Sequence, residues 1–390
     1  MQKEEGYGLV LSGGGTKGAY EVGAWKALRE LRIPIRGIVG TSIGALNAAL
    51  FFQKDPDLPE TLYTSLQAED ILEFGESVDP SKNLLGITNL RGIAFEFLKQ
   101  GGFSNALLKG NIEKYIDMNA IYRSPRDFGV MTFSIDDLTP LAVFKEDVSP
   151  ADMVNYLAAS ANFPFFKPEE MEGQRLLDGA LYDNVPINML IARGYQKILV
   201  IDISGMGMTR KALANKDVYI KKIRCSEPLG GTFEFDPERI SRNIQLGYLD
   251  TLKAFQKLQG HHFYFDIRYF NKLLENFNLD EIYGLESAAR LYGLDRFQII
   301  KDDRFLEELL TTHLKTKVIY QTIGEKGFVS HLARRPSQIM KMIDSGMGIV
   351  WIEELIRSWP AQDWMWFKRF IQDYVLAANA MIALTHYFQE

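Results

Sequence analysis

The residues of this chain best suited to chemistry lie in the stretch Gly40-Thr41-Ser42-Ile43-Gly44. This G-x-S-x-G pattern follows a short apolar run, residues 35–39, and precedes helix-forming residues 45–52. A serine in a sharp turn between a strand and a helix forms a nucleophile elbow, which exposes the hydroxyl. Gly40 and Gly44 suit such a turn because a Cβ there would collide with the neighbouring backbone. The pattern predicts Ser42 as a nucleophile for acyl transfer.

A glycine-rich stretch, Gly13-Gly14-Gly15-Thr16-Lys17-Gly18, is the second candidate. Consecutive glycines let backbone N–H groups converge on one oxygen, so Gly13, Gly14 and Gly15 are predicted to form an oxyanion hole. Lys17 either adds positive charge near a phosphate or carboxylate or is an ordinary surface lysine.

The same glycines allow a rival interpretation, because Gly13, Gly15 and Gly18 match the G-x-G-x-x-G pattern of dinucleotide sites. Such a site also needs an acidic residue at the end of the second strand, to bind the ribose hydroxyls. That strand holds Arg36 and no carboxylate. The Gly-Lys-Ser/Thr ending of a P-loop is absent as well. No nucleotide cofactor is therefore expected.

An activated serine needs a base within hydrogen-bond reach. Asp178 ends a short apolar run and is followed by Gly179, so it lies in a turn. The histidines are His261, His262, His313, His331 and His386. Two arrangements stay open at this point. In one, Ser42 and Asp178 form a triad with His261 or His262. In the other, Asp178 takes the Ser42 proton directly, which requires a carboxylate fixed in a water-poor pocket.

These residues must be positioned by strands and helices. The first strand, helix and second strand are predicted to form one βαβ unit over residues 8–40. Its helix, residues 19–31, has apolar side chains near helical spacing. Further strands are expected at residues 128–135, 141–144, 197–203 and 218–223, and helices at 150–159 and 237–258. The order predicts an α/β fold whose central sheet is mostly parallel.

Two regions lie outside this pattern. Residues 55–125 are expected to form a mostly helical insertion, punctuated by prolines. Its apolar side chains are ordinary core or a cover over an acyl-chain groove; they are Phe95, Phe97, Leu98, Phe103, Leu107 and Leu108. Residues 261–390 are expected to be mainly helical. Their aromatic side chains either pack in a helical core or contact a membrane interface; they are Trp351, Trp359, Trp364, Trp366 and Phe367.

Composition is that of a globular protein, with 46% hydrophobic and 24% charged residues among 390. The net charge of −6 gives no global basic field to attract nucleic acid. Cys225 is the single cysteine, which excludes an intramolecular disulfide and a cysteine-based zinc site. No signal peptide and no spanning apolar stretch is recognised, so a cytoplasmic or peripheral membrane location is expected.

Taken together and in this order, the motifs resemble those of the patatin-like phospholipase family. They are Gly13 to Gly18, Gly40 to Gly44 and Asp178-Gly179-Ala180, linked by residues 158–164 and 184–186. The resemblance covers roughly residues 8–203. It departs from the family at Lys17, where many members carry Arg, and at Ala180, where many carry Gly.

The resemblance implies a lipid acyl hydrolase with a three-layer sandwich, a Ser42–Asp178 dyad and no catalytic metal or cofactor. It also implies that the glycine-rich stretch is the oxyanion hole, with Gly18, Gly40, Gly44 and Gly179 supporting the motifs. We expect a patatin-like domain over residues 1–260, a helical region over 261–390, and a phospholipid or other acyl-ester substrate. Rival hypotheses are an esterase or thioesterase with the same dyad and an inactive or partner-dependent interaction protein. The oligomeric state is left open.

Overall fold

The structure is a computed structural model of the 390-residue chain. It describes residues 6–65, 67, 70, 104–163, 166–171, 173–213, 217–323, 346–358 and 372–389. Phe95, Phe97, Leu98, Phe103, His331, Trp359, Trp364, Trp366 and Phe367 lie outside these ranges. The chain divides into two compact units, Met1–Leu252 and Lys253–Glu390.

The first unit is built on a sheet with the strand order β5-β6-β3-β2-β1-β7-β8, and β4 also pairs with β3. The strands are β1 (Tyr7–Leu11), β2 (Ile35–Thr41), β3 (Asp127–Ser134), β4 (Thr139–Phe144), β5 (Glu169–Met171), β6 (Gln174–Asp178), β7 (Lys197–Asp202) and β8 (Tyr219–Arg224). Strands β3, β2, β1, β7 and β8 are parallel, whereas β4, β5 and β6 are antiparallel. The mostly parallel sheet expected from the sequence is confirmed.

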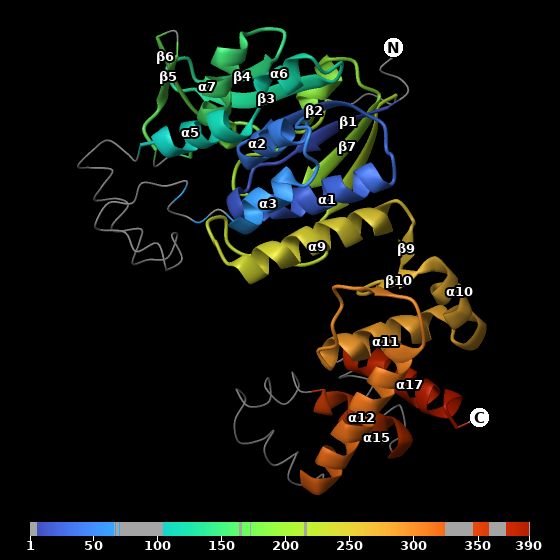
Figure 1. Ribbon diagram of the computed structural model, residues 1–390. Coiled ribbons are helices and arrows are strands. Elements are labelled where there is room, and N and C mark those ends of the chain that lie inside the picture. Colours follow the sequence, from blue (N-terminus) through green and yellow to red (C-terminus); the bar gives the residue numbers. More distant parts are fainter. Residues whose placement is uncertain are drawn as a thin grey trace. The chain divides into compact units, whose positions relative to one another are not determined.

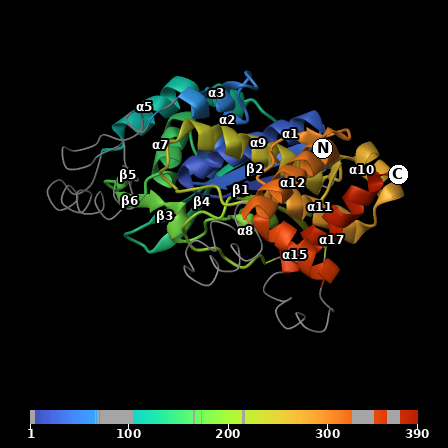
Figure 2. The same ribbon diagram turned by 90° about the horizontal axis from the view of Figure 1, so that it is seen from below.

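Helices cover both faces of this sheet (Figures 1 and 2). One face carries α1 (Ala19–Glu30), α2 (Ile43–Leu50), α7 (Pro150–Ser160) and α9 (Pro237–Ala254), and the opposite face carries α8 (Ile187–Ala192). Helices α1 and α9 cross closely, because a Cβ on Gly23 would lie 1.8 Å from the Ile244 carbonyl oxygen. The first unit is therefore the predicted three-layer α/β sandwich.

The expected insertion is helical where the structure describes it. It contains α3 (Leu58–Ser65), α5 (Ala106–Tyr115) and α6 (Met118–Tyr122). Asp117 caps α6, since its side chain accepts a hydrogen bond from the Asn119 amide at 2.9 Å. Helix α5 turns Leu108 and Ile112 inward, and both are buried. The insertion thus brings apolar side chains back towards the main domain.

The second unit is mainly helical, as expected. Its helices are α10 (Ile267–Asn276), α11 (Leu279–Leu291), α12 (Arg304–Ile323), α15 (Met347–Ser358) and α17 (Gln372–Tyr387). Most of their buried apolar side chains form a cluster that includes Leu285, Leu309 and Met381. A small sheet of β9 (Leu258–Gln259), β10 (Tyr264–Asp266) and β11 (Ile299–Ile300) accompanies them.

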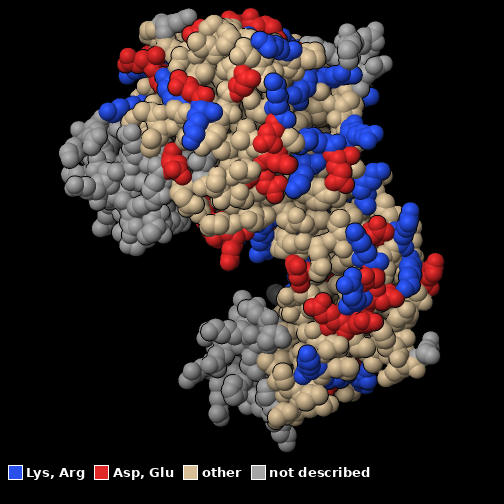
Figure 3. Space-filling model, in the orientation of Figure 1, with Lys and Arg blue, Asp and Glu red and all other residues tan. Residues whose placement is uncertain are grey.

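Acidic and basic side chains are interspersed over the face in Figure 3. This agrees with the small net charge of −6 and with the absence of a global basic field. Across the described ranges, no helix is both long enough and apolar enough to cross a bilayer.

Candidate active site

Ser42 lies between β2 and α2, in the sharp turn that the sequence predicts. Its backbone has φ 56° and ψ −128°, a conformation that a non-glycine residue rarely adopts. The flanking glycines make the turn possible. A Cβ on Gly40 would lie 2.3 Å from the Gly44 backbone, and one on Gly44 would lie 2.6 Å from the Leu11 carbonyl oxygen. The chain therefore keeps a strained serine at the carboxyl end of a central strand.

Ser160, the last residue of α7, holds this turn in place. Its hydroxyl oxygen accepts a hydrogen bond from the Ser42 amide at 2.9 Å and donates to the Met131 carbonyl at 2.7 Å. Ser160 is completely buried. It links the turn to β3, the strand next to β2 in the sheet. Ser160 lies within the linking motif at residues 158–164, but its role could not be predicted from the sequence because its partners are distant in the chain.

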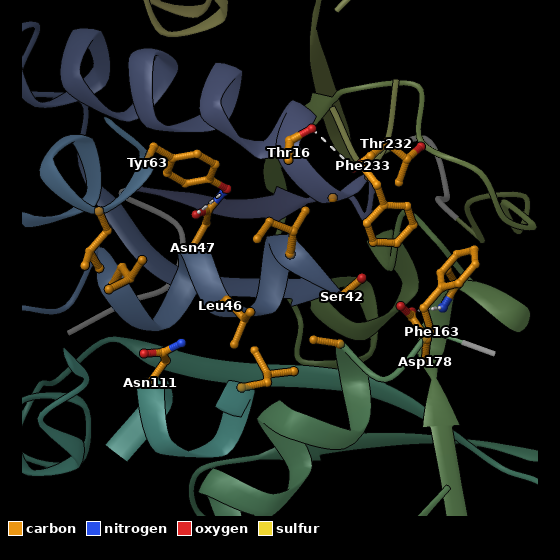
Figure 4. Close-up of a pocket in the computed structure, with 18 of the residues that line it drawn as sticks. Thr16, Ser42, Leu46, Asn47, Tyr63, Asn111, Phe163, Asp178, Thr232 and Phe233 are labelled. Carbon is orange, nitrogen blue, oxygen red and sulfur yellow. Dashed lines mark hydrogen bonds between the residues drawn. The ribbon is translucent and has the colours of Figure 1, made fainter. Parts of the chain in front are cut away.

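Asp178 ends β6 and faces Ser42. Its Oδ1 accepts a hydrogen bond from the Ala180 amide at 2.8 Å, which fixes the carboxyl group in the turn. Its Oδ2 is buried and has no hydrogen-bond partner among the described residues. Figure 4 shows the Ser42 hydroxyl and the Asp178 carboxyl pointing towards one another. Their contact is looser than a hydrogen bond, as is common in active sites without substrate.

Burial controls the basicity of this carboxyl. Asp178 is 1% exposed, and loss of hydration raises its pKa to about 7. The Ala180 amide and the nearby Ser42 hydroxyl favour the ionised form and limit the rise. Gly179 is needed after it, since a Cβ would lie 2.3 Å from the Met131 carbonyl oxygen. A carboxylate with this pKa is a far better base than a solvated aspartate.

The glycine-rich stretch runs from β1 into the first turn of the helical layer and contacts Ser42. A Cβ on Gly13 would lie 3.1 Å from Ser42 Cβ. The Gly13 amide already donates to the Asn184 carbonyl at 3.1 Å, and Asn184 Nδ2 donates back to the Gly13 carbonyl at 3.2 Å. Gly13 therefore anchors the loop, which leaves the amides of Gly14 and Gly15 as the candidates for the oxyanion hole.

The far side of the loop is anchored to the segment before α9. The Thr16 amide and hydroxyl both donate to the Thr232 carbonyl, at 2.9 and 3.2 Å. Gly15 has φ 60°, and a Cβ on it would lie 2.0 Å from the same oxygen. Lys17 Nζ donates to the Ser204 carbonyl at 3.4 Å, next to the loop that follows β7. Hydrogen bonds to the Thr232 and Ser204 carbonyls therefore hold the glycine-rich stretch in place from two sides.

Helix α1 adds a buried polar group that the sequence did not indicate. Glu21 is fully buried, and loss of hydration raises its pKa well above the ordinary value. Asn47 Nδ2 donates to Glu21 Oε2 at 2.8 Å and to the Gly18 carbonyl at 3.0 Å. Tyr63 donates to Asn47 Oδ1 at 3.2 Å. These bonds connect α1, α2 and α3 at the pocket wall, and they fix the end of the glycine loop at Gly18.

An apolar pocket opens from Ser42 in two directions (Figure 4). Towards α2, α3 and α5 its apolar lining consists of Leu46, Leu50, Leu62, Leu108, Ile112 and Ile116. In the other direction lie Phe163 and Phe233, whose rings pack edge to face with centroids 5.4 Å apart. Leu108 belongs to the predicted insertion, so part of that segment lines the pocket. The lining is mainly hydrocarbon, with Ser42 and Asp178 between the two arms.

No histidine lines this pocket among the described residues. His261, His262, His313 and His386 all belong to the second unit. Around His262, burial and the nearby positive charges lower the pKa to about 4. The described residues also contain no cluster of three metal-binding side chains of the His, Cys, Asp and Glu types. Among the described residues that line the pocket, Asp178 is the only one with a carboxyl group.

Comparison with known proteins agrees with the fold and with these motifs. Residues 9–191 match the family model described as patatin-like phospholipase. This segment contains Ser42, Asp178 and the glycine-rich stretch. The match covers somewhat less than half of the chain, and it confirms the resemblance to patatin-like phospholipases for residues 9–191.

Relatives of this domain are known from animals and fungi. The patatin-like phospholipase domain-containing protein ZK370.4 of Caenorhabditis elegans is 25% identical over 319 residues, 76% of this chain and 22% of that protein. Patatin-like phospholipase domain-containing protein 7 of Rattus norvegicus is 28% identical over 52% of this chain and 14% of its own length. Lysophospholipase NTE1 of Saccharomyces cerevisiae is 27% identical over 50% of this chain and 11% of its own length. The chain thus spans less than a quarter of each of these relatives.

Two solved structures superpose weakly on the whole chain. The crystal structure of VipD from Legionella pneumophila shares 15% identity and covers 97% of this chain and 85% of its own, with a TM-score of 0.42. The type III effector protein ExoU shares 15% identity over 97% of this chain and 78% of its own, with a TM-score of 0.33. Both scores are low, and the sheet of the first unit itself defines the fold.

Proposed function

We propose that this chain hydrolyses acyl esters of lipids, with Ser42 as the nucleophile and Asp178 as the general base. One observation carries the proposal. The two side chains face each other between the arms of an apolar pocket, and the carboxyl oxygen Oδ2 is buried without a partner among the described residues. A buried acceptor with no partner is costly, and a serine hydroxyl or a water proton would satisfy it.

The reaction would proceed in two halves. Ser42 Oγ attacks the carbonyl carbon while its proton passes to Asp178, and a tetrahedral oxyanion forms. The C–O bond to the leaving alcohol then breaks, and the alkoxide takes the proton from Asp178. In the second half, Asp178 accepts a proton from water, whose oxygen attacks the acyl-enzyme. Collapse of that intermediate releases the fatty acid, and the proton returns to Ser42.

Backbone amides would stabilise the oxyanion. The Gly14 and Gly15 amides border the pocket beside Ser42, whereas the Gly13 amide is engaged by Asn184. The amino end of α2 begins at Ile43, directly after the nucleophile, and its dipole also favours negative charge there. Preorganised donors of this kind each contribute about 10²- to 10³-fold to turnover.

The pocket supports a long acyl chain as the group that is transferred. Its lining is mainly hydrocarbon. Each Å² of acyl-chain surface that the pocket removes from water would contribute about 25 cal/mol to binding. The names of the relatives from Rattus norvegicus and Saccharomyces cerevisiae describe a phospholipase domain and a lysophospholipase. We therefore place glycerophospholipids and lysophospholipids first among the substrates of this chain, before short esters and thioesters.

The test is hydrolysis of a panel of diacyl phospholipids, lysophospholipids, triglycerides, acyl thioesters and short esters by the wild type and Ser42→Ala. Long-chain phospholipid esters should be cleaved fastest, and Ser42→Ala should lose at least 10³-fold in each active case. Equal rates for acetyl and long-chain esters would favour a small-ester esterase instead. No turnover of any ester by the wild type would favour an interaction protein.

A further inference from the structure

We propose that the loop of residues 204–213, which follows β7, docks the mouth of the pocket onto a phospholipid surface with anionic headgroups. The proposal rests on the proposed function for the nature of the substrate, since a lipid hydrolase must take its substrate from an aggregate or a bilayer. It assigns the contact to the first unit, at the edge of the sheet where Ser42 lies.

The loop concentrates exposed apolar side chains. Met206 is 47% exposed, Met208 51% and Leu213 75%, and Leu181, in the turn after Asp178, is 37% exposed. These four are among the six large apolar side chains exposed in the described part of the first unit. Exposed apolar residues scattered singly are normal, but a group of this kind marks a contact surface.

The loop begins at the entrance to the pocket and ends beside α8, where the Leu213 amide donates to Asn188 Oδ1 at 2.7 Å and Asn188 Nδ2 donates to the Lys211 carbonyl at 3.1 Å. Met206 is part of the pocket lining, so it connects the outer surface with the cavity. The Met208 amide donates to the Ala180 carbonyl at 2.9 Å, and its carbonyl accepts from the Asn184 amide at 2.6 Å. Gly205 lies against the glycine loop, because a Cβ there would come within 1.8 Å of the Gly13 carbonyl oxygen. The loop is therefore bonded to the turn that carries the base.

Basic side chains accompany the apolar ones. Arg210 and Lys211 lie in the loop and are exposed, and Lys17 reaches the Ser204 carbonyl at its start. Two carboxyl groups lie nearby: Asp183 is buried beneath Arg210, and Asp202 accepts a hydrogen bond from the Ser204 amide. The outward-facing charges of the loop itself are positive, although the whole chain carries −6.

This combination fits an anionic lipid surface better than a protein partner. Methionine is flexible and apolar, so it can enter an irregular layer of acyl chains. Binding at a membrane interface grows with buried apolar area and with attraction between basic residues and anionic lipids. A bilayer placed on this loop would also present its lipids directly to Met206 and the pocket.

The experiment measures binding of the full chain to vesicles, in the Ser42→Ala background so that the lipids stay intact. Vesicles of phosphatidylcholine alone are compared with vesicles containing about one third phosphatidylserine, at low and high salt, by co-sedimentation. The chain should bind the anionic vesicles more tightly, and high salt should weaken that binding. Because binding needs no turnover, this result is independent of whether the proposed reaction occurs.

Two changes test the loop itself. Met208→Ser combined with Leu213→Ser should weaken binding to both vesicle types by roughly tenfold, because it removes apolar surface. Lys211→Gln should weaken binding to anionic vesicles by about fivefold at low salt and leave phosphatidylcholine binding unchanged. The matched control combines Tyr219→Ser and Lys197→Gln. Both residues are exposed at the amino ends of β8 and β7, the opposite edge of the sheet.

The control should bind within about twofold of the parent, and all variants should keep the parent melting temperature within about 2 °C, as expected for surface substitutions. Absence of vesicle binding by the parent would overturn the proposal, and so would equal losses in the control and the loop variants. If the parent binds and only the loop variants lose affinity, the loop is the docking surface.

Discussion

Replacement of Asp178 by Asn should make the first unit more stable at high pH while it abolishes turnover. Asp178 has a pKa of about 7 in the folded chain because it is buried, against an ordinary value of 3.8. Between these two pH values the folded chain holds a proton that the unfolded chain has released. The free energy of unfolding of the wild type therefore falls as pH rises from about 4 to 7, and stays reduced above that range.

The size of this effect follows from the two pKa values. A separation of about three units corresponds to about 4 kcal/mol at pH 8, or about 1.4 kcal/mol per pH unit within the window. The asparagine of the variant cannot ionise, so the free energy of unfolding of the variant does not fall in this way as pH rises. The amide nitrogen of that asparagine is left buried without an acceptor, at a cost of about 1–3 kcal/mol that does not depend on pH.

The assay is urea unfolding at several pH values. It is monitored by hydrogen exchange of peptides from β1, β2 and β3, so that it reports on the unfolding of the first unit alone. The stability of Asp178→Asn relative to the wild type should rise steadily from about pH 4.5 to 6.5. Asp136→Asn is the matched control, because Arg175 lowers the pKa of Asp136 and the rise should be missing there. A flat difference for Asp178→Asn would refute the assignment of a buried, desolvated carboxyl.

Three further changes test the supports of the site. Ser160→Ala removes the acceptor of the Ser42 amide, and should lower kcat by about tenfold or more with little change in KM, as steady-state kinetics can show. Leu46→Trp should fill one arm of the pocket, and should lower the rate of hydrolysis of long-chain esters at least tenfold while the rate for acetyl esters stays unchanged. Its control is Leu138→Trp, at an exposed hairpin, which should change neither rate. Gly15→Ala places a Cβ against the Thr232 carbonyl at a positive φ, and should lower both the melting temperature and kcat.

The pH dependence of turnover has a consequence for choosing between a dyad and a triad. Activity should fall below about pH 7 as Asp178 becomes protonated. This midpoint lies in the range of an ordinary histidine, so the acid limb alone does not separate the two mechanisms. Substitution of the histidines does separate them. If the dyad operates, His261→Ala and His262→Ala should each leave turnover within a few-fold of the wild type.

Local features of the fold could be predicted from the sequence. The βαβ unit and the turn at Ser42 follow from apolar runs and glycines close together in the chain, and β1, α1, β2 and α2 lie within two residues of the expected positions. The apolar run that ends at Asp178 suggested a strand there, but β5 and the antiparallel pairing of β6 with β3 were not expected, because this pairing depends on contacts between residues far apart in the chain. Those strands nevertheless carry Asp178 to the site.

Several supports of the site could not be found from sequence patterns. Ser160, Asn184 and Thr232 act through hydrogen bonds to Ser42, Gly13 and Thr16, which lie far away in the chain. Residue types alone do not reveal such pairs, since serine, asparagine and threonine are common in turns. The raised pKa of Asp178 was expected in principle, but its cause is tertiary burial. The predicted oxyanion donors were the amides of Gly13, Gly14 and Gly15, but the Gly13 amide donates to the Asn184 carbonyl, which leaves Gly14 and Gly15 as candidates.

The most direct test of the central claim is labelling with a fluorophosphonate, followed by peptide mass spectrometry. Ser42 should carry the label, Ser42→Ala should remain unlabelled, and Asp178→Asn should react roughly 10³-fold more slowly than the wild type because the base is lost. His261→Ala and His262→Ala should react at nearly the wild-type rate. Labelling of a different serine, or undiminished labelling of Ser42 in Asp178→Asn, would contradict a Ser42–Asp178 dyad.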